Sequence, residues 1–131
     1  MRIEHLAIWV SNLERMRNFY EEYFGATSGA KYINEKKGFS SFFLSFKGGP
    51  RLEIMHRPDI SKKKWKQDPA DESLGLIHFA ISVGSMEKVN NLTAQLKLKG
   101  IRVLGEPRTT GDGYYESLVV DPEGNKIEIT V

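Results

Sequence analysis

The sequence contains no cysteine, which excludes disulfide bonds and thiolate catalysis. The absence of cysteine is compatible with a reducing cytoplasm, where we expect the protein to reside. No unbroken apolar run is long enough to span a bilayer, and the first residues lack the hydrophobic segment of a signal peptide. We therefore expect no membrane anchor and no secretion.

The sequence also has no large excess of positive or negative charge. The 19 Lys and Arg against 17 Asp and Glu give a net charge of +2, which is too small to favour nucleic-acid binding. The one basic run, Lys62 to Lys66, is typical of a solvated loop. The 131 residues are 40% hydrophobic and 27% charged, which is typical of one globular domain with a buried core.

One short pattern is present twice. Residues 3–10 read IEHLAIWV, and residues 76–83 read LIHFAISV. Both contain His–apolar–Ala–Ile–x–Val, and their β-branched residues predict a strand. Each predicted strand therefore places one His in otherwise apolar surroundings.

The elements after each of these strands follow the same order. Apolar residues at helical spacing, a capping residue (Asn12 or Ser11, then Ser85) and a closing glycine (Gly25, Gly100) predict helices over 13–24 and 86–99. Three strands follow each helix: 27–33, 39–46 and 51–55 in the first half, and 102–104, 114–120 and 126–130 in the second. The chain is therefore predicted to be βαβββ twice.

The spacing between the halves supports a true repeat. His5 and His78 are 73 residues apart (78 − 5), and Glu53 and Glu128 are 75 apart (128 − 53). Regular spacing of this kind indicates two like modules packed together. We predict an α+β fold in which two βαβββ modules form a curved mixed sheet around a cavity. Within this single domain, 1–131, the modules are 1–56 and 76–131 and the linker is 57–75.

The alternation of side chains along a strand sorts these residues into faces. The apolar rows beside the histidines should pack under the helices, which places His5, Glu53, His78 and Glu128 on the faces away from the helices. Imidazole nitrogens and carboxylate oxygens are ligands for Zn, Ni, Mn, Fe or Co. A single His or Glu on such a face is usually only solvated, so the prediction of a metal site depends on the matched pairs. His56 has no counterpart in the repeat.

Three segments carry a resemblance to a known family: HLAI with NFYEEYFG in the first half, LIHFAISV, and DPEGNKIEI near the end. With the paired βαβββ modules, they resemble the vicinal-oxygen-chelate superfamily. Its members include glyoxalase I, methylmalonyl-CoA epimerase, fosfomycin-resistance thiol transferases, extradiol dioxygenases and bleomycin-resistance proteins. The last segment resembles the family's DPxGxxIEL ending. The fold hosts several chemistries, so the resemblance alone does not define the reaction.

The resemblance implies a ligand set and a mechanism. The His–Glu–His–Glu order of bacterial glyoxalase I falls on His5, Glu53, His78 and Glu128, so one divalent ion (Zn, Ni, Co, Mn or Fe) is expected per site. A lyase of this kind uses the metal as a Lewis acid that stabilises an enediolate. Glu128 is the predicted catalytic base, with Glu53 as a second catalytic carboxylate. Short relatives commonly form homodimers, with each site within one chain or shared by two.

The substrate is left open by one departure from the family. Bacterial glyoxalase I commonly has an arginine in the first strand for the glutathione carboxylate, and Trp9 stands there instead; an indole cannot replace a guanidinium fork. The predicted substrate-contacting residues are Trp9, Arg51, Met55, Arg108, Tyr114 and Lys126, with the loop 108–115 near the cavity mouth. A methylglyoxal–thiol hemithioacetal is one candidate substrate. The alternatives are an epimerase-like isomerase and a protein that binds and sequesters an antibiotic-type small molecule.

Overall fold

The computed structural model describes residues 1–60, 68–72 and 74–131, which form two compact units, Met1–Lys63 and Lys64–Val131. The basic run at 62–66 and part of the predicted linker 57–75 lie outside the described residues. Among the described residues, no helix is both long enough and apolar enough to cross a membrane.

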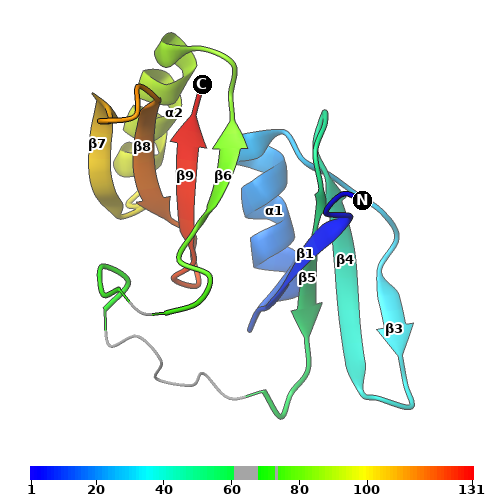
Figure 1. Cartoon of the computed structure of the whole chain (residues 1–131). Coiled ribbons are helices and arrows are strands. Elements are labelled where there is room, and N and C mark those ends of the chain that lie inside the picture. The colour runs from blue at the N-terminus through cyan, green and yellow to red at the C-terminus, as the bar shows by residue number, and fades with distance from the viewer. Residues whose placement is uncertain (61–67, 73) are drawn as a thin grey trace. The chain divides into compact units, whose positions relative to one another are not determined.

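The first unit is a mixed sheet with one helix. Its elements are β1 His5–Trp9, α1 Leu13–Phe24, β2 Thr27–Ser28, β3 Tyr32–Asn34, β4 Phe39–Ser45 and β5 Arg51–His56. The strand order is β1-β5-β4-β2. β3 is also paired to β4 (Figure 1). β1 and β5 are parallel, whereas β4 is antiparallel to each of its partners.

One predicted strand of this unit, 27–33, is two short strands. From Ser28 to Tyr32 the chain advances four residues, while their partners on β4, Leu44 and Ser41, are only three residues apart. One extra residue on one side of a ladder interrupts the regular pairing, as a bulge does. The prediction of one continuous strand was therefore wrong in this detail.

α1 has the bounds that the sequence predicts. The Asn12 side chain caps it by accepting a hydrogen bond from the Arg15 backbone N–H at 2.9 Å, which satisfies a donor at the open end of the helix. Gly25 ends it with φ 62°, a left-handed conformation that favours glycine. Its buried residues recur at helical spacing: Leu13, Met16, Phe19 and Tyr20.

The second unit has a four-stranded sheet in the order β6-β9-β8-β7. Its elements are β6 Phe79–Ser82, α2 Met86–Leu98, β7 Val103–Thr109, β8 Tyr115–Val120 and β9 Lys126–Thr130. β6 and β9 are parallel, as β1 and β5 are. β7 is longer than the predicted 102–104, because it continues past Gly105 and Pro107 through register shifts. An edge strand tolerates Gly and Pro in this way.

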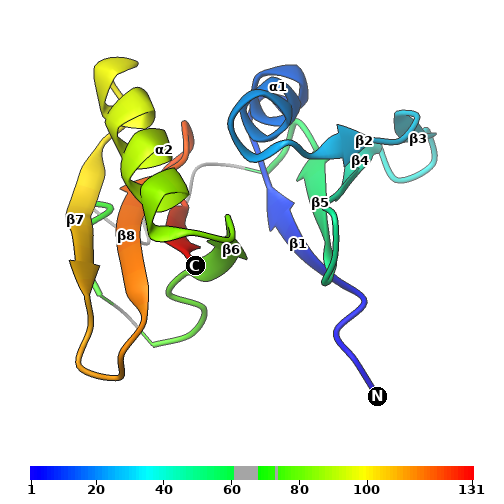
Figure 2. The ribbon, with the colours of Figure 1, turned by 90° about the horizontal axis from the view of Figure 1, so that it is seen from above.

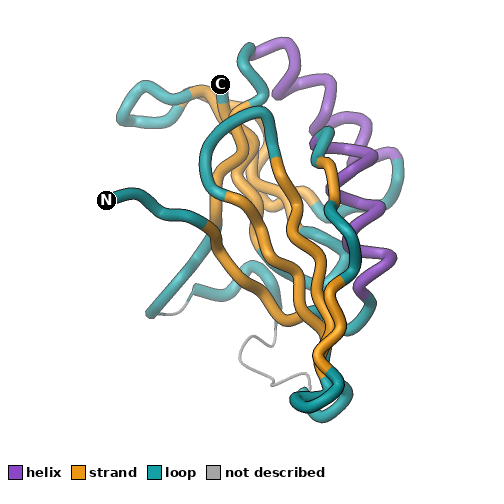
Figure 3. Tube along the Cα trace, turned by 90° about the vertical axis from the view of Figure 1, so that its right-hand side faces the viewer, coloured by secondary structure: helices purple, strands orange, loops and turns teal. Residues whose placement is uncertain are grey.

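In each unit the helix packs on one face of the sheet, with α1 against β4 and β5 and α2 against β7, β8 and β9 (Figures 2 and 3). The buried residues of that face include Leu52 and Ile54 on β5, and Ile127 and Ile129 on β9. Because strand residues alternate, Glu53 and Glu128 point to the opposite face. The predicted α+β fold is confirmed.

Candidate functional site

The first unit brings His5 and Glu53 together on the face of the sheet away from α1. Parallel pairing of β1 with β5 places Ala7, two residues after the His, opposite Glu53. His5 Nε2 lies 3.8 Å from Glu53 Oε2. The Glu53 side chain is only 14% exposed and that of His5 39%, so the carboxylate lies deeper in the unit than the imidazole.

The second unit repeats this arrangement with His78 and Glu128. Ala80, again two residues after the His, pairs with Glu128 in the parallel register of β6 and β9. His78 Nε2 lies 3.3 Å from Glu128 Oε2, and the Glu128 side chain is 18% exposed. His78 lies one residue before β6. Each unit therefore pairs one imidazole with one partly buried carboxylate.

Glu128 has a second carboxyl group, that of Glu116 on β8, as its neighbour. Burial raises the pKa of Glu128 above its ordinary value, and the charge of Glu116 raises it further, while His78 acts in the opposite direction. A hydrogen bond between the two carboxyl groups also contributes to the raised pKa. Arg108 Nη2 lies 3.8 Å from Glu116 Oε1. Glu128 therefore holds a proton more readily than an exposed glutamate does.

Glu116 was not predicted from the sequence, because the repeat does not contain it twice. The residue 75 positions earlier is Ser41, whose side chain is fully buried; among the described residues its Oγ has no hydrogen-bond partner. The alternation of side chains along paired strands could have identified Glu116. Glu116 pairs with Thr130, two residues after Glu128, so both glutamates lie on the same face.

Glu4 was also missed, and it contacts the first histidine directly. Its carboxylate lies 2.5 Å from His5 Nδ1 and forms an ion pair with Arg51. The hydrogen bond with His5, followed by that with Arg51, lowers the pKa of Glu4. Glu4 therefore remains an anion near neutral pH. It lies one residue before β1 and beside the His5–Glu53 pair.

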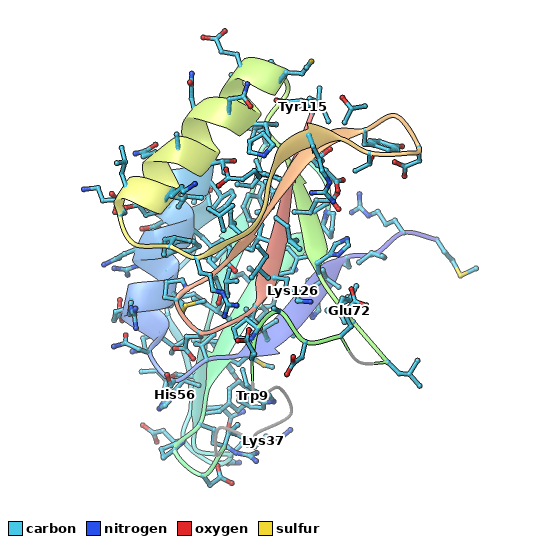
Figure 4. All side chains as sticks on the ribbon, turned by 90° about the vertical axis from the view of Figure 1, so that its left-hand side faces the viewer. Trp9, Lys37, His56, Glu72, Tyr115 and Lys126 are labelled. Atoms are coloured by element: carbon cyan, nitrogen blue, oxygen red, sulfur yellow. The ribbon has the colours of Figure 1, made fainter. Side chains whose placement is uncertain are left out.

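Other residues of the first unit form an aromatic surface around Trp9. The Trp9 ring is 41% exposed and meets Phe39 edge-on, with 6.4 Å between ring centroids. The Arg57 guanidinium lies 5.4 Å from the Trp9 ring centroid. His56 Nδ1 is 3.0 Å from the Val10 carbonyl oxygen, next to Trp9 in the chain (Figure 4). The half-buried Met55 pairs with Trp9 across β1 and β5.

The remaining predicted contacts of the second unit differ in accessibility. Tyr114 is 59% exposed in the hairpin between β7 and β8, which is closed by a 2.8 Å hydrogen bond from the Thr110 N–H to the Tyr114 carbonyl. Lys126 is only 4% exposed, and its ammonium group donates to the Asp71 carbonyl at 3.2 Å (Figure 4). The Lys126 ammonium group is thus hydrogen-bonded to a backbone carbonyl inside the second unit.

The donor chemistry of the two His–Glu pairs is suited to a divalent transition metal. Neutral imidazole nitrogen and carboxylate oxygen are both ligands for such ions. Within the part of the chain that the structure describes, no three His, Cys, Asp or Glu side chains form a group that could hold a metal ion. Each unit by itself therefore presents one imidazole and one carboxylate of this kind.

The comparisons identify the family. The Glyoxalase/Bleomycin resistance protein/Dioxygenase superfamily profile matches residues 2–129. The chain belongs to this superfamily, which includes glyoxalase I enzymes and whose members generally bind a divalent metal ion.

Several relatives are similar over most of this chain. The uncharacterized protein YwkD of Bacillus subtilis is 29% identical over 97% of this chain and 94% of its own length. The lactoylglutathione lyase GLX1 of Arabidopsis thaliana is 30% identical over 98% of this chain, and the bovine mitochondrial methylmalonyl-CoA epimerase 28% over 84%. The chain spans only 43% of the plant enzyme and 61% of the bovine enzyme.

Solved structures agree with this assignment. The trypanothione-dependent glyoxalase I of Leishmania major superposes with a TM-score of 0.77 at 26% identity, over 99% of this chain and 86% of that one. A superfamily domain from Frankia reaches a TM-score of 0.81 at 16% identity, over 100% of this chain and 97% of that one. The second likeness is evidence for the fold alone.

Proposed function

We propose that this protein is a metal-dependent, glyoxalase-like lyase or isomerase that moves a proton between neighbouring carbons of a small carbonyl substrate. The observation that carries the proposal is the duplicated His–Glu pair. Each unit of the chain presents one His and one Glu on the sheet face away from its helix. The distance from the His Nε2 to the Glu Oε2 is 3.8 Å in the first unit and 3.3 Å in the second. Solvated surface residues have no reason to match in this way.

The proposed metal ligands are His5, Glu53, His78 and Glu128. Two of these ligands come from each unit. The two units can belong to one chain or to two different chains. We propose that the protein is a homodimer. A bound Zn, Ni, Co, Mn or Fe ion would supply Lewis acidity to two adjacent oxygens of the substrate. That chemistry makes the C–H bond beside the carbonyl more acidic.

Glu128 is the proposed proton-transferring residue. It would accept the proton from the carbon beside the carbonyl and return it to the neighbouring carbon. Burial and the Glu116 carboxylate raise its pKa, which makes it a stronger base than an exposed glutamate. Glu53, the matching carboxylate of the first unit, is its proposed partner. The substrate-contacting residues that we propose are Trp9, Arg51, Met55, Arg108, Tyr114 and Lys126.

The substrate that we would test first is a hemithioacetal of methylglyoxal and a thiol. This choice is supported by the similarity to the Arabidopsis lactoylglutathione lyase. The similarity to the bovine epimerase makes an acyl-CoA epimer the second substrate to test. Turnover of either compound that depends on added metal, and that is lost in His78→Ala, would support the proposal.

One observation favours a second function, the binding of an apolar small molecule without turnover. Trp9 presents an exposed indole beside Phe39 on the same unit as the His5–Glu53 pair, and aromatic side chains supply much of the contact area of small-molecule sites. A sequestering protein would bind its ligand stoichiometrically, without a metal-dependent rate. Ligand binding that quenches tryptophan fluorescence in the wild type but not in Trp9→Phe, together with no turnover of any tested carbonyl substrate, would favour this function.

A further inference from the structure

Glu4 is held in place through both its backbone and its side chain. The Arg51 backbone N–H donates to the Glu4 carbonyl at 3.1 Å, which extends the pairing of β1 and β5 by one residue. The carboxylate then binds two groups at once: one oxygen forms an ion pair with the Arg51 guanidinium, and the other lies 2.5 Å from His5 Nδ1. Glu4 therefore connects the side chains of Arg51 and His5.

This contact distinguishes the two nitrogens of the His5 ring. A carboxylate can only accept, so Nδ1 must carry the hydrogen, and the lone pair of a neutral ring is then on Nε2. Nε2 is the nitrogen that lies 3.8 Å from Glu53. The atom available to bind a metal thus lies on the same side of the ring as the other ligand of this unit.

We propose that Glu4 is a positioning residue, which fixes the Nδ1–H tautomer of His5 and directs Nε2 toward Glu53. The inference rests on the proposed function, in which His5 is a metal ligand. A carboxylate behind a ligating histidine orients the ring and makes it a better donor, and its loss typically costs 10–100-fold in metal affinity.

The surroundings of His5 restrict the ring further. Phe43 meets the imidazole edge-on, with 5.3 Å between ring centroids. The Arg51 guanidinium lies 4.2 Å from the centroid of the Phe43 ring while it pairs with Glu4. Arg51 is therefore anchored at two points, and through Glu4 it restricts the orientation of His5.

Among the described residues, the second unit has no equivalent contact. The residue before His78 is Ile77, whose side chain has no hydrogen-bond acceptor. At the position of Arg51 the repeat has Lys126, whose ammonium group is buried against the Asp71 carbonyl. The inference therefore predicts that removal of Glu4 affects His5 and leaves His78 unchanged, which provides an internal control.

The test compares Glu4→Ala and Glu4→Gln with a matched control, Glu106→Gln, whose carboxylate pairs only with Lys97 among the described residues. The Glu4 side chain is 53% exposed, so its removal leaves no cavity in the core. The first measurement is the ¹⁵N chemical shift of the His5 and His78 ring nitrogens, in metal-free protein at one pH. The second is the dissociation constant for Zn²⁺, obtained by competition with a fluorescent chelator.

In Glu4→Ala, we expect the His5 ring to lose its preference for the Nδ1–H tautomer and the Zn²⁺ affinity to fall about 10-fold, the lower end of the range because the site is partly exposed. Glu4→Gln keeps an oxygen acceptor, so it should retain the tautomer and lose less affinity. His78 should not change, and Glu106→Gln should match the wild type in both measurements.

An unchanged His5 tautomer in Glu4→Ala would overturn the inference, as would equal shifts at His5 and His78. Unchanged Zn²⁺ affinity in a wild type that binds Zn²⁺ would also overturn it. A wild type that binds no Zn²⁺ would instead contradict the proposed function, and the tautomer measurement would still decide the role of Glu4.

Discussion

Replacement of Glu128 by glutamine separates catalysis from stability. Glutamine has nearly the same shape and retains an oxygen donor, but it cannot accept the proton of the substrate. A positioned general base typically contributes roughly 10²–10⁴-fold to the rate, so Glu128→Gln should lower kcat by at least that factor at equal metal occupancy. This corresponds to about 3–5 kcal/mol of lost transition-state stabilisation at 1.36 kcal/mol for each tenfold change.

The same substitution should not lower the stability of the folded protein, because of the surroundings of Glu128. Because burial and Glu116 raise the pKa of Glu128 in the folded protein, the folded state favours the protonated form. This contribution to the free energy of unfolding is present below the unfolded pKa and is lost as the pH rises through the folded pKa. At neutral pH the ionised Glu128 therefore costs stability, and the neutral glutamine of the metal-free variant should be at least as stable as the wild type.

The first measurement is kcat of the metal-loaded proteins with a hemithioacetal substrate. The second is thermal unfolding of the metal-free wild type, Glu128→Gln and Glu53→Gln at pH 7. Glu53→Gln is the matched control, because it changes the equivalent carboxylate of the other unit. We expect it to lose less activity, because Glu53 is the proposed partner of the base and not the base itself. Full activity of both variants would refute a carboxylate mechanism, and a larger loss in Glu53→Gln would make Glu53 the base.

Three further predictions concern the scaffold. Gly25→Ala should lower the free energy of unfolding by about 1–2 kcal/mol in urea titrations, because residue 25 has φ 62°; no loss would contradict the capping role of this glycine. The pKa of Asp68 is lowered by the Ala70 N–H and by Arg102, so its stabilising contribution should be lost as the pH falls below about 4. In urea titrations across pH, the free energy of unfolding of Asp68→Asn should then fall less steeply below about pH 4 than that of the wild type. An unchanged pH dependence would exclude the contribution of Asp68. Sedimentation at micromolar concentration should show a homodimer, and a stable monomer would overturn the proposed assembly.

Much of the fold could be predicted because it is encoded locally and then repeated. The bounds of α1 follow from a capping Asn12, helical spacing and Gly25, all of which are readable in one short segment. The faces of Glu53 and Glu128 follow from the alternation of side chains along single strands. The repeat provided a second, independent reading of each of these features.

The missed features depend on neighbours in space. Glu4 and Glu116 occur once each, so the repeat could not identify them, and their contacts with His5 and Glu128 require the sheet register. The interruption between β2 and β3 likewise depends on one extra residue opposite β4. The sequence alone does not show which residues pair across these strands. The alternation of residues gives the face of a side chain, but not its partner.

In the function that we propose, both His–Glu pairs are needed to hold one divalent ion. Metal titration by calorimetry, with Zn²⁺ or Ni²⁺, of wild type, His5→Ala, His78→Ala and the control His56→Ala tests this requirement. We predict one ion per set of two pairs in the wild type and in His56→Ala, and a large loss of affinity in each of the other two variants. Tight binding that survives both His5→Ala and His78→Ala, or no binding by the wild type, would exclude a metal site made of these two pairs.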